Sequence, residues 1–157
     1  MDILITYDYR EEDLARLPLE KLARFVLAHE EKPDNTEVSI SFVDDETIAD
    51  LNEHYRGKSG PTDVLSFECD GAENDFDAAV SAQESDLVFE LGDVIIAPDV
   101  AMRQTHEFKT TFEEEVSLLL VHGLLHLCGY DHVEDDEAAV MESLEAEILA
   151  AWANRRA

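Results

Sequence analysis

Three histidines, His122, His126 and His132, lie close together at the end of a long apolar segment. The first two are four residues apart. Four residues on a helix advance about 400°, so the two rings share one face and can reach one ion. Gly129 allows the chain to reverse after the helix, so that His132 returns to the same point. Burying imidazoles on an apolar helix is costly without partners, and a metal ion is such a partner.

The spacing predicts one zinc ion held by these three histidines and a water molecule. Imidazole ligands in a tetrahedral site favour zinc among the transition metals, and an open fourth position is typical of catalytic sites. Cys128 is about 200° around the helix from His126 and should point away from the ion. Asp131 is a candidate to orient a ligand ring, although a solvated loop acid is an equally good interpretation. Packing alone explains one or two core histidines more readily than three histidines with a glycine between the second and third.

The same spacing occurs in the metzincin proteases, whose motif is HExxHxxGxxH. Here Gly123 follows the first histidine, so the glutamate that serves as general base in those proteases is missing. Met141 is better interpreted as a core residue of the last helix than as part of a Met-turn. The sequence therefore disfavours a protease, and the base must come from elsewhere or from the substrate.

A second group of residues with possible chemistry lies in a glycine-rich link, where Arg56 and Lys58 precede an apolar segment. The planar guanidinium of arginine offers a fork of donors that matches phosphate. On composition alone, a solvated surface arginine is the better interpretation of Arg56.

Hydrophobic periodicity predicts the elements that must position these residues within one domain, residues 1–157. Four strands are predicted at 2–7, 38–42, 62–67 and 91–97. Helices are predicted at 18–30, 44–55, 98–106 and 135–152, and a buried one follows the Thr111–Glu114 capping box and ends before Gly129. Residues 70–90 form a long acidic loop in this prediction. The order indicates an α+β fold with a four-stranded mixed sheet packed against a buried central helix and further helices.

The composition is strongly acidic, with 38 Asp and Glu against 11 Lys and Arg and a formal net charge of -27. Such a surface repels nucleic acid at long range, although solubility or a salty host is the more general explanation. The N-terminal residues contain no basic segment followed by an apolar run, and no stretch approaches the roughly 20 residues of a membrane span. With two distant cysteines, Cys69 and Cys128, and no CxxC pair, the prediction is a reducing, cytoplasmic location.

Several segments resemble one known family. HGLLHLCGYDH at 122–132 is similar to the H-G-x-L-H-L-x-G-Y-D-H signature of the YbeY endoribonuclease family and matches every fixed position. PTDVLSF at 61–67, preceded by Asn52 and Arg56, resembles its second motif. LGDVIIA at 91–97 and MESLEAEIL at 141–149 resemble two further segments. The resemblance covers nearly the whole chain.

This resemblance implies a metal-dependent, single-strand-specific endoribonuclease that acts in 16S rRNA 3′-end maturation and ribosome quality control. It implies that His122, His126 and His132 are the zinc ligands and that Arg56 acts in catalysis or RNA binding. The family fold is α+β, with the metal in a cleft between the sheet and the helices. The implied partners are single-stranded RNA and rRNA on the ribosome or small subunit, with neither membrane nor DNA expected.

The chain departs from the family pattern at Glu68, where a proline is common, and in the long acidic segment that follows. RNA binding to so acidic a chain requires cations near the cleft, and the candidates are Arg56, Lys58, Arg103 and Lys109. The nucleophile, a metal-activated water or the RNA 2′-hydroxyl, stays open. Two other hypotheses are a non-protease metallohydrolase of another substrate class and a noncatalytic zinc-containing ribosome-assembly factor.

Overall fold

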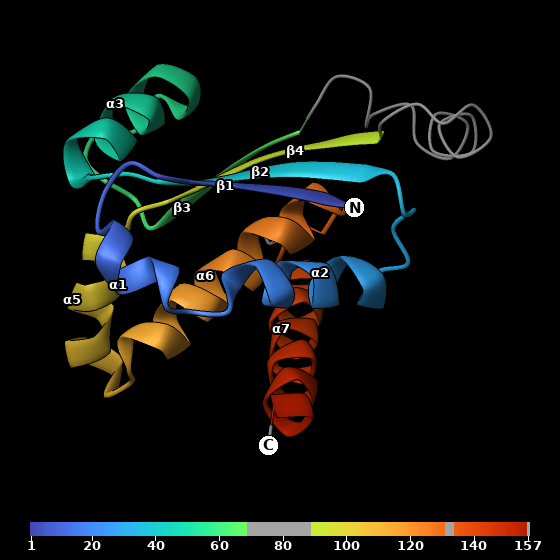
Figure 1. The fold of residues 1–157 in the computed structure, drawn as a ribbon. Coiled ribbons are helices and arrows are strands. Elements are labelled where there is room, and N and C mark those ends of the chain that lie inside the picture. Colours follow the sequence, from blue (N-terminus) through green and yellow to red (C-terminus); the bar gives the residue numbers. More distant parts are fainter. Residues whose placement is uncertain (69–88, 131–133, 157) are drawn as a thin grey trace.

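Four strands form one mixed sheet in the computed structural model, which describes residues 1–68, 89–130 and 134–156 (Figure 1). The strands are β1 (Asp2–Tyr7), β2 (Thr36–Phe42), β3 (Val64–Glu68) and β4 (Phe89–Ile96), in the order β1-β2-β4-β3. β2 is parallel to both β1 and β4, whereas β3 is antiparallel to β4. The predicted four-stranded mixed sheet is therefore confirmed, and β3 lies at the end of the strand order.

The helices are α1 (Glu11–Ala15), α2 (Leu19–His29), α3 (Asp45–Arg56), α5 (Pro98–Phe108), α6 (Phe112–Leu127) and α7 (Asp135–Arg156). α6 packs on one face of the sheet and contacts α2, α5 and α7, which surround it on the same side (Figure 1). α3 lies on the other side of the sheet, at the end where β3 begins. Two layers thus enclose the strands at that end, and residues of both α3 and α6 are brought near β3.

The alternating pattern of β2 explains which face of the sheet the helices cover. Val38, Ile40 and Phe42 are at most 1% exposed and belong to the main core, while the residues between them are half-buried. A second, smaller cluster on the α3 side contains Ile48 and Leu65. Both clusters reach β3, because neighbouring strand residues point to opposite faces.

The central helix α6 is held at both ends by local interactions that the sequence predicted. The Thr111 hydroxyl accepts a hydrogen bond from the Glu114 amide at 3.1 Å, and the Glu114 carboxylate accepts one from the Thr111 amide at 3.1 Å. After the C-cap residue Cys128, Gly129 adopts a φ of 105°, which favours glycine and turns the chain. The capping box is confirmed, and Gly129 has the conformation expected of the glycine after the helix; the return of His132 lies outside the described residues.

The element bounds differ from the prediction in several places. β4 begins at Phe89, because Phe89 pairs with Thr36, so the end of the predicted acidic loop 70–90 is wrong; residues 70–88 lie outside the described residues. α1 was not predicted, and α7 continues to Arg156. Met141 is 1% exposed and belongs to the core, as predicted.

In the described ranges, no helix has the length and apolarity needed to cross a membrane.

Candidate functional site

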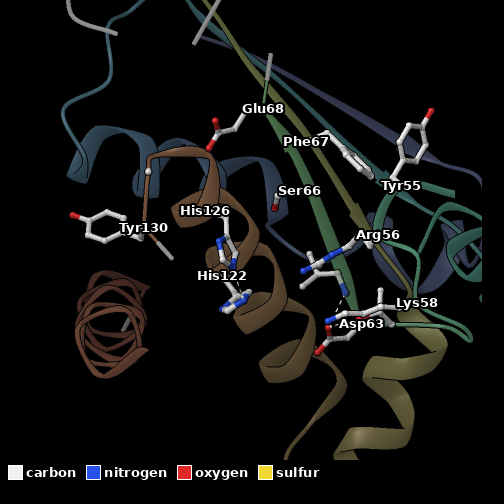
Figure 2. Close-up of a pocket in the computed structure, with 13 residues that line it drawn as sticks. Tyr55, Arg56, Lys58, Asp63, Ser66, Phe67, Glu68, His122, His126 and Tyr130 are labelled. Carbon is white, nitrogen blue, oxygen red and sulfur yellow. Dashed lines mark hydrogen bonds between the residues drawn. The ribbon is translucent and has the colours of Figure 1, made fainter. Parts of the chain in front are cut away.

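A cleft of about 880 Å³ opens between β3 and the C-terminal end of α6 (Figure 2). Three segments line it. The end of α3 and the loop after it contribute Tyr55, Arg56, Lys58, Thr62 and Asp63, β3 contributes Val64, Ser66, Phe67 and Glu68, and α6 with its C-terminal turn contributes His122, His126, Gly129 and Tyr130. Residues that are more than 50 positions apart in the sequence therefore face one space.

Two of the predicted ligands meet in this cleft. Nε2 of His122 and Nε2 of His126 are 3.1 Å apart, and the two rings are nearly perpendicular at 81°. The prediction that the two imidazoles share one face of the helix and reach one point is confirmed. Two nitrogens that each lie about 2.0–2.1 Å from one tetrahedral zinc ion are roughly 3.3 Å apart, so this pair fits a shared zinc ion.

Glu145 of α7 contacts His122 on the side of its ring away from His126. Its carboxylate contacts Nδ1 of His122, the ring nitrogen that faces away from His126. Glu145 is 8% exposed, so the contact is shielded from solvent. A carboxylate at one ring nitrogen fixes the ring and raises the basicity of the other nitrogen as a ligand. Sequence reasoning did not single out Glu145, and its only signal was its place in the MESLEAEIL segment.

The third predicted ligand, His132, lies outside the described residues, as does Asp131. Within the described ranges, no group of three or more His, Cys, Asp or Glu side chains is placed to hold a metal ion. Cys128 does not line the cleft but packs against the main core, as expected from its position on the helix. Burial raises the pKa of the Cys128 thiol to about 11, which keeps it protonated at neutral pH.

Gly123 occupies the position of the glutamate in the protease motif, and its surroundings leave no space for a side chain. A Cβ atom at this position would lie 2.6 Å from Cγ1 of Val94 and 3.2 Å from Cγ2 of Val64. The Ser66 hydroxyl also donates a hydrogen bond to the Gly123 carbonyl at 2.9 Å. The helix face beside His122 is thus pressed against β3 and β4, and it has no room for a glutamate side chain.

Arg56 and Lys58 lie across the cleft from the two histidines (Figure 2). Both side chains are exposed, and Arg56 is the last residue of α3. Gly57 ends the helix with a φ of 67°, and the Asn52 amide donates to the Gly60 carbonyl at 3.0 Å. These local contacts fix the loop, so Arg56 and Lys58 are presented to the cleft from a defined backbone.

The other two predicted cations are not in the cleft. Arg103 forms an ion pair at 2.9 Å with Asp45, the first residue of α3, and Lys109 follows the end of α5. Neither residue lines the cleft, so the predicted grouping of four cations is wrong for Arg103 and Lys109. Sequence spacing did not show that Arg103 would be paired by a residue nearly 60 positions away.

Two carboxylates complete the lining. Asp63 accepts hydrogen bonds from the Val64 amide at 2.8 Å and from the Gln104 side chain at 3.2 Å, so it secures the start of β3. Glu68 ends β3, is exposed and lies on the side of the cleft toward His126 and Tyr130 (Figure 2).

The α+β arrangement of this sheet and these helices is a known fold. The structure resembles the solution structure of TM1509 from Thermotoga maritima with a TM-score of 0.58, covering 98% of this chain and 93% of that one. At 24% sequence identity, this likeness shows the fold alone.

The sequence identifies the family. The profile of the family described as Endoribonuclease YbeY matches residues 5–153. An Endoribonuclease YbeY of Thermoanaerobacter sp. (strain X514) is 41% identical over 155 residues, covering 96% of each chain. That of Frankia casuarinae is 40% identical over 153 residues, covering 97% of this chain and 75% of the relative. The chain belongs to the YbeY family and, with it, to the endoribonucleases.

Proposed function

We propose that this protein is a zinc-dependent, single-strand-specific endoribonuclease that acts in 16S rRNA 3′-end maturation and in ribosome quality control. The observation that carries the proposal is the pair of Nε2 atoms of His122 and His126, 3.1 Å apart, in the same cleft as Arg56. Membership in the YbeY family supports the RNA substrate. The proposed location is the cytoplasm, and the proposed partner is the ribosome or its small subunit.

His122, His126 and His132 hold the zinc ion in this proposal. Zinc bound there supplies a Lewis acid that neutralises charge developing on phosphate oxygens. Arg56 binds a nonbridging oxygen of the scissile phosphate through its planar fork of donors and stabilises the same charge from the opposite side of the cleft. Glu145 keeps His122 turned so that its Nε2 faces the cleft.

The charge distribution limits where RNA binds. The chain carries a formal net charge of -27, yet Arg56 and Lys58 both line the cleft. At physiological ionic strength, interactions between exposed charges are largely screened beyond about 8 Å. A phosphate beside Arg56 and Lys58 therefore experiences these cations more strongly than carboxylates elsewhere on the surface, although Asp63 and Glu68 also line the cleft.

The experiment compares the zinc-loaded protein with His126→Ala, purified identically, on an end-labelled single-stranded RNA. We expect cleavage by the wild type, loss of cleavage in the variant, and loss on addition of a chelator that is reversed by zinc. Equal cleavage by both proteins would indicate a contaminating nuclease and contradict the proposal. No cleavage by either, on free RNA and on small subunits, would favour a noncatalytic assembly factor.

The ends of the products separate the two nucleophiles. Attack by the RNA 2′-hydroxyl leaves a 2′,3′-cyclic phosphate, whereas attack by water leaves a linear phosphate. A cyclic phosphate in the products would exclude water as the nucleophile of the first step.

A further inference from the structure

Tyr55 stands apart from the other exposed apolar side chains of this protein. The large hydrophobic residues exposed in the described ranges are Leu4, Tyr55, Phe108 and Val140, and Tyr55 is the most exposed of them at 61%. It is also the one of the four that lines the histidine cleft. Single exposed apolar side chains are common on protein surfaces, so the position of Tyr55 in the cleft lining, rather than its exposure, makes it a candidate to contact a ligand.

The Tyr55 ring is held in place by two neighbours. The ring of Phe67, from β3, lies 5.2 Å away at an interplanar angle of 61°, and the ring of His54 lies 4.5 Å away at 89°. Both contacts are edge-to-face and leave most of the tyrosine accessible. Figure 2 shows Tyr55 and Phe67 together on the Arg56 side of the cleft. A ring that is already positioned loses little conformational entropy when a ligand stacks on it.

We propose that Tyr55 is a stacking platform for an unpaired nucleobase next to the scissile phosphate. The inference rests on the proposed function and adds the part of the substrate that this side of the cleft recognises. Tyr55 and Arg56 end α3 and both line the cleft, so a cation for phosphate and a π-face for a base are available in the same space. A nucleotide carries the two matching groups, a phosphate and a base, close to each other.

This arrangement also provides a physical reason for single-strand specificity. A base in a duplex is paired and stacked on both sides, so it reaches Tyr55 only after it is unstacked at a cost of a few kcal/mol. An unpaired base stacks on an aromatic side chain without that cost, and every base has a π-face. Tyr55 is therefore expected to favour single strands over duplexes while discriminating weakly among bases.

The competing explanation is that Tyr55 only covers the apolar cluster on the α3 side through Phe67. Three substitutions separate the two roles. Tyr55→Phe keeps the π-face, Tyr55→Leu keeps an apolar side chain without a π-face, and Tyr55→Ala removes both. Phe108→Ala is the matched control, because Phe108 is 58% exposed but does not line the cleft. Melting temperatures establish that each variant is folded.

The measurement is direct binding of a short single-stranded oligoribonucleotide, of a series with one abasic residue at successive positions, and of an RNA duplex. Stacking predicts that Tyr55→Ala and Tyr55→Leu bind the intact single strand about 5- to 100-fold more weakly, while Tyr55→Phe and Phe108→Ala bind like the wild type. At one position, removal of the base should weaken wild-type binding by a similar factor and should not add to the effect of Tyr55→Ala. Duplex binding should be weak and insensitive to these variants.

Wild-type affinity in a folded Tyr55→Leu would overturn the inference, as would fully additive losses at every abasic position. Failure of the wild type to bind the single strand at all would overturn it as well. Binding that depends on Tyr55 without any RNA cleavage would instead contradict the proposed nuclease and leave the stacking platform supported.

Discussion

Glu145 on α7 contacts Nδ1 of His122 on α6, although the two residues are 23 positions apart. The contact leaves Nε2 of His122 directed at Nε2 of His126, 3.1 Å away. A histidine on a helix can rotate about two side-chain torsions, so the spacing of the pair does not by itself orient either ring. α7 therefore determines how α6 presents the Nε2 atom of His122 to the cleft.

Substitution Glu145→Gln tests this positioning role. Glutamine keeps the size of the side chain but removes the charge that favours a basic Nε2, so we expect zinc affinity to fall about 10- to 100-fold. Competition with a chelator of known affinity measures the change without relying on RNA cleavage. The matched control is Glu142→Gln, an exposed glutamate of the same helix. Equal affinity in the two variants would contradict the role of Glu145.

Gly123→Ala is expected to destabilise the protein. The new methyl group would meet Cγ1 of Val94 at 2.6 Å, so β4 or α6 must shift. Overpacking of this kind typically costs about 1–3 kcal/mol in the free energy of unfolding. Denaturant unfolding measures that change, with Ser143→Ala at an exposed helical position as the control. A stability equal to that of the control would show that α6 is not packed against β4 at Gly123.

Arg56→Ala and Arg56→Lys separate the charge of this residue from its geometry. If Arg56 stabilises the transition state, alanine should lower kcat by about 10²- to 10³-fold, as removal of a positioned donor does elsewhere. Lysine should restore only part of that loss, because a point charge cannot donate two parallel hydrogen bonds. Arg103→Ala is the control, since Arg103 pairs with Asp45 outside the cleft. Equal rates for Arg56→Ala and this control would exclude a role for Arg56 in the chemical step.

Glu68→Gln should strengthen RNA binding. Glu68 places a carboxylate in the lining of a cleft that is proposed to hold phosphate, and removing the charge removes a repulsion. The gain should be largest at low salt and should shrink as salt screens the carboxylate. Affinity titrations at several salt concentrations measure it, with Glu12→Gln as the control, because Glu12 is an exposed residue of α1 that does not line the cleft. Weaker binding by Glu68→Gln would indicate that the carboxylate contributes to the site directly.

Local sequence determined much of the fold because the interactions that form a helix or strand are short-range. The run at residues 2–7 is apolar and flanked by polar residues, and this was enough to predict β1 with its observed bounds. The capping box at Thr111 and Glu114 involves residues three apart, and the His122–His126 pair needs only the pitch of one helix. The apolar residues all around the helix axis likewise indicated that α6 is buried, and Met141 was predicted to belong to the core.

The short helix α1 shows where local reasoning stopped. Five residues cannot form a stable helix on their own, because nucleation fixes several torsions for few hydrogen bonds. Arg10, just before this helix, donates to Asp99 of α5 at 2.6 Å, and the Tyr9 hydroxyl donates to the same carboxylate at 2.8 Å. The contacts with Asp99 hold the start of α1, and no local sequence pattern predicts them.

Only the tertiary structure decided which residues share the cleft. Arg56 reaches it from the end of α3 and Lys58 from the loop that follows, because β3 is the edge strand of the sheet and α6 packs against it. Arg103 and Lys109 have the same charge but are carried elsewhere by α5. The geometry of the His122–His126 pair was determined by one helix and its sequence. Three other features depend on how separate elements pack: the contact of Glu145 with His122, the lack of space at Gly123 and the position of Tyr55. That packing depends on the burial of side chains from the whole chain, so no local pattern predicts it.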